Sequence, residues 1–248
     1  MYALHEAHEQ HHWWFAARRR IVLHQLRREI DRHDEPLRLL DVGCGAGGML
    51  DHLREFGDVT GVDPAPAAVR YAAGKGADVR FGTLPHDLPF TTSEHFDVIT
   101  LLDVLEHIDD DHASLRALHR LLEPGGLLLL TVPAFPSLWS GHDVVNEHKR
   151  RYTRSGLRQR LEGAGFDVRM LSFFNAALFP PIAGVRIVKR WLGGTEAGGD
   201  LGEVPRPLNA VLRTVFAAER HVLGLLPLPF GVSLIAVARA RNPEGAGR

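Results

Sequence analysis

The chain has almost no cysteine, since Cys44 is the single one among its 248 residues. A lone cysteine excludes a disulfide within the chain and fits a reducing compartment. The N-terminal residues also lack the apolar core of a secretion signal. We therefore expect a cytoplasmic protein.

Long hydrophobic runs and an excess of charge of one sign are also absent. The longest apolar run, residues 222–238, is interrupted by Pro227 and Pro229 and is shorter than the ~20 residues that cross a bilayer. The net charge is -1, and no cluster of basic residues stands out. These features exclude a membrane span and a nucleic-acid-binding surface. They are compatible with a peripheral contact to a membrane.

Glycines gather at one point of the sequence, directly after an apolar segment that ends at Val42. Gly43, Gly45 and Gly48 lie in a turn that a helix is expected to follow at once. Glycine permits positive φ and a close approach of backbone to ligand, and the N-terminus of a helix attracts anionic groups. The turn predicts a nucleotide-cofactor site, but it also fits the G-x-G-x-x-G pattern of dinucleotide enzymes.

Further segments narrow the choice of cofactor. Asp41 stands where a dinucleotide enzyme usually keeps an apolar residue, and a second strand ends at Asp63, the usual position of a ribose acceptor. The motifs, in order, are LLDVGCGAGG, VTGVDP, HFDVITLLDVLEHI and LEPGGLLLLTVP. Together they resemble the class I S-adenosylmethionine-dependent methyltransferases, and the resemblance covers residues 37–175.

The order of apolar and helical segments indicates the fold class. Strands and helices alternate, which is typical of an α/β doubly wound sheet. The resemblance implies a Rossmann-like, seven-stranded, mostly parallel sheet whose last strand is antiparallel. We expect strands near 38–43, 58–63, 77–82, 96–102, 126–132, 166–171 and 232–239, and helices near 47–56, 65–74, 110–122 and 153–164.

The sequence divides into three parts. Residues 1–35 are expected to form an N-terminal helical segment, and residues 36–175 with 230–241 the methyltransferase core. Residues 176–229 would be a helical cap inserted between strands six and seven, because the roughly sixty residues between those two strands are too many for a structureless loop. The cap is apolar, so it would pack on the sheet, form a homodimer, or close over the acceptor as a lid.

Several residues are candidates to bind the cofactor. A carboxylate at Asp63 suits the two ribose hydroxyls, with Pro64 beside it, although Asp63 would also serve as a helix N-cap. Gly43 and Gly45 would form the turn around the cofactor. The resemblance places Asp41 near the ammonium group of S-adenosylmethionine, and a buried structural aspartate is the alternative.

The resemblance assigns further cofactor contacts. Leu84 would pack against adenine, Leu102 and Asp103 would line the crevice, and Arg18 would bind the cofactor carboxylate. The acid that the family places after Gly82 is Thr83 here, so Asp87 is a possible substitute for it. The other interpretation of Arg18 is a place on the polar face of an amphipathic helix.

A polar loop after the fifth strand carries the candidate catalytic residues His142, Asp143 and His148. Methyl transfer to a hydroxyl requires alignment of the acceptor and removal of its proton. A histidine beside a carboxylate performs this task, although two histidines in a polar loop are often only solvated. Their spacing matches no standard metal site, and we predict no metal.

These observations favour a methyltransferase that acts on a hydroxyl of a small molecule, a sugar, or a lipid-linked or secondary-metabolite acceptor with a hydrophobic body. The product of the cofactor would be S-adenosylhomocysteine. The loop pattern H-D-x-x-x-x-H-x-R-R-Y resembles a bacterial subgroup of glycan and secondary-metabolite pathways, related to the ubiquinone-type O-methyltransferases. The alternatives are N- or C-methylation, a NAD-dependent dehydrogenase, and a non-catalytic protein that binds the cofactor and serves a partner.

Overall fold

The structure is a computed structural model that describes residues 11–30, 35–180, 184 and 204–242. Its centre is a seven-stranded sheet with the strand order β3-β2-β1-β4-β5-β7-β6. The strands are β1 Leu37–Val42, β2 Gly57–Asp63, β3 Asp78–Phe81, β4 Phe96–Leu102, β5 Leu122–Pro133, β6 Phe166–Phe174 and β7 Ser233–Ala240.

The directions of the strands confirm the predicted architecture. Strands β1 to β5 are parallel to one another. Strand β7 lies between β5 and β6 and is antiparallel to both. The strand order reverses between β1 and β4, and in open α/β sheets ligands bind at the carboxyl ends of the strands beside such a reversal.

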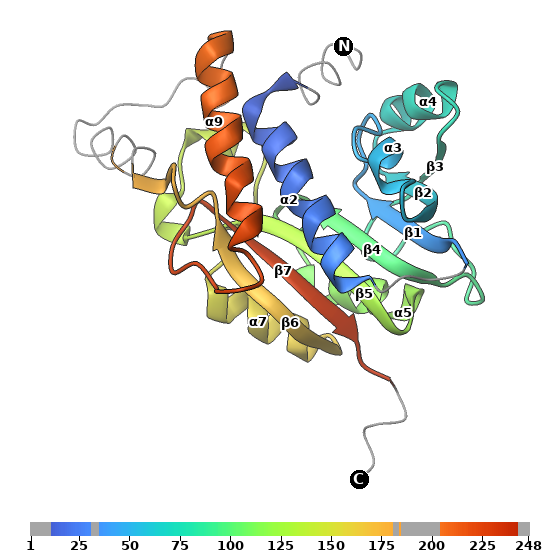
Figure 1. The fold of residues 1–248 in the computed structure, drawn as a ribbon. Helices are drawn as coiled ribbons and strands as arrows, with labels where there is room; N and C mark the ends of the chain where they lie inside the picture. Colours follow the sequence, from blue (N-terminus) through green and yellow to red (C-terminus); the bar gives the residue numbers. More distant parts are fainter. Residues whose placement is uncertain (1–10, 31–34, 181–183, 185–203, 243–248) are drawn as a thin grey trace.

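Helices cover both faces of the sheet (Figure 1), and this explains why its central strands are mostly apolar and buried. Strand β5 shows the alternation: Leu127 and Leu129 belong to one buried cluster, and Leu128 and Leu130 to the other. The helices are α2 Trp13–Glu29, α3 Leu50–Leu53, α4 Pro66–Gly74, α5 Asp111–Leu121, α6 Gly141–Val145, α7 Arg154–Gly163 and α9 Arg206–Ala218, with the 3-10 turns η1 Leu105–His107, η2 Pro136–Leu138 and η3 Glu219–His221.

Each face of the sheet has its own helices. Helices α5 and α7 pack on one face through Leu115, Leu118, Leu157 and Leu161. Helices α2 and α9 lie together over the other face, where Ile21 and Phe216 are fully buried. The N-terminal helix is therefore part of the apolar core around the sheet.

One predicted element is wrong in extent. The helix expected at 47–56 is only α3, Leu50–Leu53, and residues 44–49 form a turn. The reason is local, because Gly45 and Gly47 adopt φ of 54° and 87°, which a right-handed helix does not permit. The dipole of this short helix therefore contributes much less to cofactor binding than the sequence suggested.

The cap is described only in part. The apolar segment 183–192, apart from residue 184, and the glycine-rich segment 193–202 lie outside the described residues. Helix α9 packs against α2 and is followed by η3. The division into three parts stays a prediction. No helix among the described residues has the length and apolar character to cross a membrane.

Candidate functional site

The glycine turn after β1 requires glycine at Gly43. Its φ is 75°, and a Cβ at this position would lie 2.3 Å from Cγ2 of Val104, in the segment after β4. The amide nitrogens of Gly43 and Cys44 donate to the carbonyl of Val62, at 2.7 and 3.1 Å. The ends of β1, β2 and β4 therefore meet around this turn, at the reversal of strand order.

Asp63 fixes the turn from the end of β2. Its carboxylate accepts hydrogen bonds from the backbone nitrogens of Gly45 at 2.8 Å and Ala65 at 2.9 Å. The alternative role as a helix N-cap is wrong, because α4 begins at Pro66 with Ala65 as its N-cap. Each carboxylate oxygen keeps further acceptor capacity for a ligand hydroxyl. Pro64, beside it, is exposed.

Asp41 is a buried member of β1. It is 3% exposed, and its Oδ1 accepts a hydrogen bond of 2.6 Å from the hydroxyl of Thr100 in β4. This contact crosses between the two strands that flank the reversal of strand order. Both interpretations of Asp41, cofactor contact and structural acid, fit this position, and its role at the ammonium group stays a prediction.

The structure brings together two predicted cofactor residues, Arg18 of α2 and Asp103 after β4, as an ion pair. Asp103 has φ of 57° and also accepts a hydrogen bond of 2.9 Å from the hydroxyl of Thr131. Positive φ is uncommon outside glycine, although aspartate adopts it more readily than most residues. The Nε of Arg18 has no hydrogen-bond partner among the described residues, so the guanidinium keeps a donor for an anionic ligand.

Leu84 lies in a short loop after β3. Thr83 and Asp87 exchange two backbone hydrogen bonds, of 2.7 and 2.9 Å, which close this loop. Leu84 is buried inside it, while the side chain of Asp87 is exposed. Leu102, at the end of β4, is buried as well. The adenine contacts of Leu84 and Asp87 stay predictions.

Asp143 and His148 form the central pair of the polar loop. Oδ1 of Asp143 lies 2.8 Å from Nδ1 of His148 and 2.8 Å from Nε of Arg151. Burial alone would raise the pKa of Asp143, but the hydrogen bonds from His148 and Arg151 outweigh it and hold the pKa of this carboxyl below its ordinary value. An ionised Asp143 accepts a hydrogen bond from Nδ1–H of His148, and this tautomer leaves Nε2 of the neutral ring with its lone pair.

The three predicted catalytic residues therefore differ in their positions. Asp143 is fully buried and also caps α6 through Ser140, so it orients His148 and does not reach an acceptor. His142 is beside Asn146, whose side-chain nitrogen lies 3.2 Å from its Nε2. His148 is the member of the group that lies close to Glu106 and His107.

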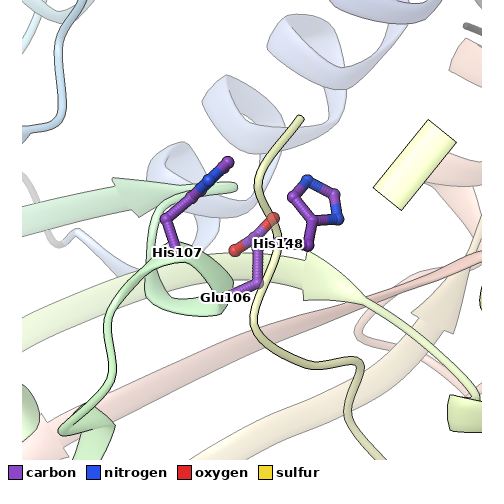
Figure 2. A group of neighbouring side chains, drawn as sticks. All are labelled: Glu106, His107 and His148. Carbon is purple, nitrogen blue, oxygen red and sulfur yellow. The ribbon is translucent and has the colours of Figure 1, made fainter. Parts of the chain in front are cut away.

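A cluster that the sequence did not reveal surrounds His148. Glu106 and His107 of η1 lie beside it, and the side chains of the three residues point toward one another (Figure 2). Their ligand atoms all lie within 4.8 Å of one another. The sequence suggested instead a grouping of His142, Asp143 and His148. In the structure, Asp143 contacts Nδ1 of His148, on the side of the ring away from Nε2.

Glu106 is an unusual member of this cluster. It is 1% exposed, and its Oε2 has no hydrogen-bond partner among the described residues. Burial, together with the negative charge of Asp103, raises the pKa of this carboxyl well above its ordinary value. Burial and the charge of His148 lower the pKa of His107. Perturbed groups of this kind often mark functional sites.

Sequence reasoning missed four further residues: Glu106, His107, Arg151 and the Thr131 partner of Asp103. One signal was available, since Glu106 and His107 directly follow the segment of Asp103 at the carboxyl end of β4. In a sheet of this type, residues at that position face the ligand crevice. Nothing in the sequence indicated that Arg151 is a buried partner of Asp143.

Curated proteins with related sequences match part of this chain. The ubiquinone biosynthesis O-methyltransferase of Azorhizobium caulinodans is 31% identical over 168 residues, which are 60% of this chain and 64% of that protein. The one of Xanthomonas oryzae pv. oryzae is 39% identical over 101 residues, 38% of this chain and 42% of that protein. The matches thus span less than two thirds of the length of these relatives.

A comparison with solved structures agrees on the fold. A SAM-dependent methyltransferase from Archaeoglobus fulgidus superimposes with a TM-score of 0.57 at 22% identity, covering 88% of this chain and 94% of that one. The family model described as "Methyltransferase domain" matches residues 12–171, which include the glycine turn, Asp63, Asp103 and His148. The chain therefore belongs to the class I S-adenosylmethionine-dependent methyltransferase family, with S-adenosylmethionine as its cofactor.

Proposed function

We propose that the protein transfers the methyl group of S-adenosylmethionine to a hydroxyl oxygen of a small-molecule acceptor. The observation that carries this proposal is the Asp143–His148 pair, because the 2.8 Å contact to the Nδ1 atom leaves Nε2 available as a base. In the reaction the acceptor oxygen forms a bond to the methyl carbon as the carbon–sulfur bond breaks. The acceptor proton passes to Nε2, and S-adenosylhomocysteine leaves.

Two facts support the choice of oxygen as the methylated atom. The two related proteins from Azorhizobium caulinodans and Xanthomonas oryzae pv. oryzae are O-methyltransferases by name. A hydroxyl must lose its proton during the transfer, so it gains more from a positioned histidine than a neutral amine does. The proposed acceptor remains a hydroxyl compound, glycan or lipid-linked molecule with a hydrophobic body.

The test identifies the methylated atom directly. The pure protein is incubated with S-adenosylmethionine carrying a ¹³C methyl group and an extract of small metabolites from the source cells. We expect new products whose ¹³C shifts and fragment masses belong to methoxy groups. Labelled methyl groups found only on nitrogen or carbon, or no transfer beside intact cofactor binding, would refute O-methylation.

Replacing Asp63 with alanine tests the cofactor site. The variant loses the proposed hydrogen bonds to the ribose hydroxyls and the anchor of the Gly45 amide. Hydrogen bonds to a charged group are worth about 1.5–3 kcal/mol, so the dissociation constant of S-adenosylmethionine should rise about 10- to 100-fold. Isothermal titration calorimetry measures it.

The matched control is Asp58→Ala, since Asp58 lies exposed at the other end of the same strand. This variant should bind the cofactor as the wild type does. An unchanged dissociation constant in Asp63→Ala, or tighter binding of NAD than of S-adenosylmethionine by the wild type, would contradict the proposed ribose contact.

A divalent cation is a second candidate component of the site. Glu106, His107 and His148 offer one oxygen and two nitrogen ligands within 4.8 Å of one another, a set that suits zinc and related first-row ions. The Oε2 of Glu106, without a partner among the described residues, fits this role. A bound ion would polarise the acceptor hydroxyl as a Lewis acid. It would also occupy Nε2 of His148, so the ion and the free base are competing interpretations.

Metal binding separates these interpretations without any activity assay. If the cluster holds an ion, Glu106→Gln should weaken binding of Zn²⁺ or Mn²⁺ about tenfold or more, measured by calorimetry on chelator-treated protein. The control is Glu147→Gln, a nearby exposed acid, which should bind as the wild type does. Equal affinities in the two variants would show that Glu106 is not a ligand.

A further inference from the structure

Four phenylalanine rings lie in a row at the carboxyl ends of β5 and β6, and we call them the aromatic row. They are Phe135, Phe173, Phe179 and Phe230. The rings of Phe135 and Phe173 are stacked, with centroids 4.8 Å apart and an angle of 8° between their planes. The ring of Phe179 lies 5.6 Å from that of Phe135, and the ring of Phe230 lies 5.5 Å from that of Phe179. The row therefore joins the loops that follow β5 and β6 with the segment that precedes β7.

The aromatic row extends from the core to the surface. Phe173 is buried, Phe135 and Phe179 are partly buried, and Phe230 is 43% exposed. The rings of a closed core are covered by other side chains, whereas the outer rings of this row keep accessible surface. Ligand pockets are lined mainly by hydrophobic and aromatic side chains, and the row has this character.

Hydrogen bonds connect the aromatic row with the polar loop that carries His148. Phe135 follows Ala134, whose carbonyl accepts a hydrogen bond of 3.1 Å from Arg151 in that loop. The amide of Phe135 donates to the carbonyl of Tyr152 at 3.0 Å. The row therefore starts where the loop of the proposed base folds onto the end of β5, at the edge of the sheet where ligands bind.

Backbone strain marks the same edge of the sheet. Phe135 has φ of 56° and ψ of 102°, a conformation that a bulky residue rarely adopts. Three other non-glycine residues among those described have positive φ: Asp103 after β4, Glu147 in the polar loop, and Asn175 after β6. Strained residues cluster at active sites and ligand clamps. The conformation of Phe135 therefore supports a role in ligand binding.

We propose that the aromatic row binds the apolar body of the methyl acceptor, with Phe179 and Phe230 as specificity-determining residues. Contacts between rings add to the energy of burial, so the row favours a flat, unsaturated body. An aliphatic body of the same size gains only the burial. The inference rests on the proposed function, because it places the acceptor hydroxyl at the end of the row that is connected with the loop of His148.

Binding of two probe alcohols to the full chain tests the proposal. The probes are 2-naphthol and decahydro-2-naphthol, which share one carbon skeleton and one hydroxyl, but only the first is flat. Titration calorimetry in saturating S-adenosylhomocysteine measures the two dissociation constants. We expect the wild type to bind 2-naphthol about two- to tenfold more tightly, which is the range for contacts between rings.

The variant Phe230→Leu should lose this preference. Its affinity for 2-naphthol should fall about two- to tenfold, and its affinity for decahydro-2-naphthol should stay near that of the wild type. Because the ring of Phe230 is 43% exposed, the variant should keep the fold and the affinity for S-adenosylmethionine. Phe179→Leu repeats the test from within the row. The matched control is Phe81→Leu, which changes a ring that is 48% exposed on β3, the other edge of the sheet, and should keep the preference.

Several outcomes overturn the proposal. Equal binding of the two probes by the wild type, or no binding of 2-naphthol, would remove the flat acceptor. If folded Phe230→Leu and Phe179→Leu proteins keep the wild-type preference, the rings serve only the packing of the loops.

The ¹³C-methyl experiment reports separately on the proposed function. A protein that shows the ring-dependent preference but forms no methoxy product refutes O-methylation and leaves the aromatic row as a binding surface for flat ligands. A protein that forms methoxy products without any effect of Phe230→Leu or Phe179→Leu on probe binding keeps the proposed function and loses the role of the row.

Discussion

Replacing His148 with alanine is expected to lower kcat by about 10²–10⁴-fold while the dissociation constant of S-adenosylmethionine stays near that of the wild type. The reason is the position of the ring. Nδ1 is 2.8 Å from the buried carboxylate of Asp143, so Nε2 is the nitrogen that is free to take the acceptor proton. Removing a general base lowers the rate of the chemical step and does not alter the contacts of Asp63 with the cofactor.

The matched control is His142→Ala. His142 belongs to the same loop but lies beside Asn146, so this variant should keep kcat within a few-fold of the wild type. The two variants are compared by steady-state kinetics with saturating cofactor, and cofactor binding is checked by calorimetry. In the wild type, kcat should rise with pH, because a base must first lose its proton, and the variant should lack this rise.

Two results would contradict the assignment of His148 as the base. If His148→Ala keeps full activity, no general base is needed. Alignment of the acceptor then accounts for the rate, and the loop contributes only to the shape of the pocket. If the activity of the wild type is lost with a chelator and restored by a divalent ion, His148 acts as a ligand together with Glu106 and His107. The second result leaves O-methylation in place and changes only how the acceptor oxygen is activated.

The parts of the fold that the sequence predicted are those governed by local pattern. Strand β5 was expected because a run of leucines follows Pro124, Gly125 and Gly126, and the run proves to be buried on both faces of the sheet. The position of Asp63 at the end of β2 was predicted from the acid that closes this short strand about 20 residues after the glycine turn. Both features depend on neighbours along the chain, which a single sequence contains.

The errors and omissions depend on contacts that the sequence does not encode locally. The helix expected at 47–56 was too long because the positive φ of Gly47 was not foreseen. The role of Asp143 was only partly predicted, since its burial and its bond to Arg151 appear only when the loop folds back on the end of β5. Glu106 and His107 were not linked with His148 because the loop that joins them is defined by tertiary packing.

A second large effect is expected for Asp143→Asn, which should lower the free energy of unfolding at neutral pH by about 3–5 kcal/mol. Asp143 is fully buried, and the side chain of its partner Arg151 is only 2% exposed. The substitution removes the carboxylate charge that lies 2.8 Å from this buried guanidinium. It also weakens the cap of α6, because Oδ2 of Asp143 accepts the amide of Ser140 at 2.9 Å.

The effect should depend on pH in a defined direction. The pKa of Asp143 is lower in the folded protein than its ordinary value of 3.8, since the bonds from His148 and Arg151 outweigh the cost of burial. Its contribution to stability is therefore fully present above that ordinary value and is lost as the pH falls through the folded pKa. The difference between wild type and variant should be constant from neutral pH to about pH 5 and shrink below about pH 3.8.

Urea unfolding at several pH values measures this difference, and Asp167→Asn is the control. Asp167 pairs with Arg169 at 3.4 Å, but its side chain is 62% exposed, so its loss should cost less than about 1 kcal/mol. The double variant Asp143→Asn/Arg151→Met should be less destabilised than the sum of the single variants, because it removes both members of the buried ion pair together. A small or pH-independent effect of Asp143→Asn would show that the buried pair does not hold the loop, and the orientation of His148 would then require another cause.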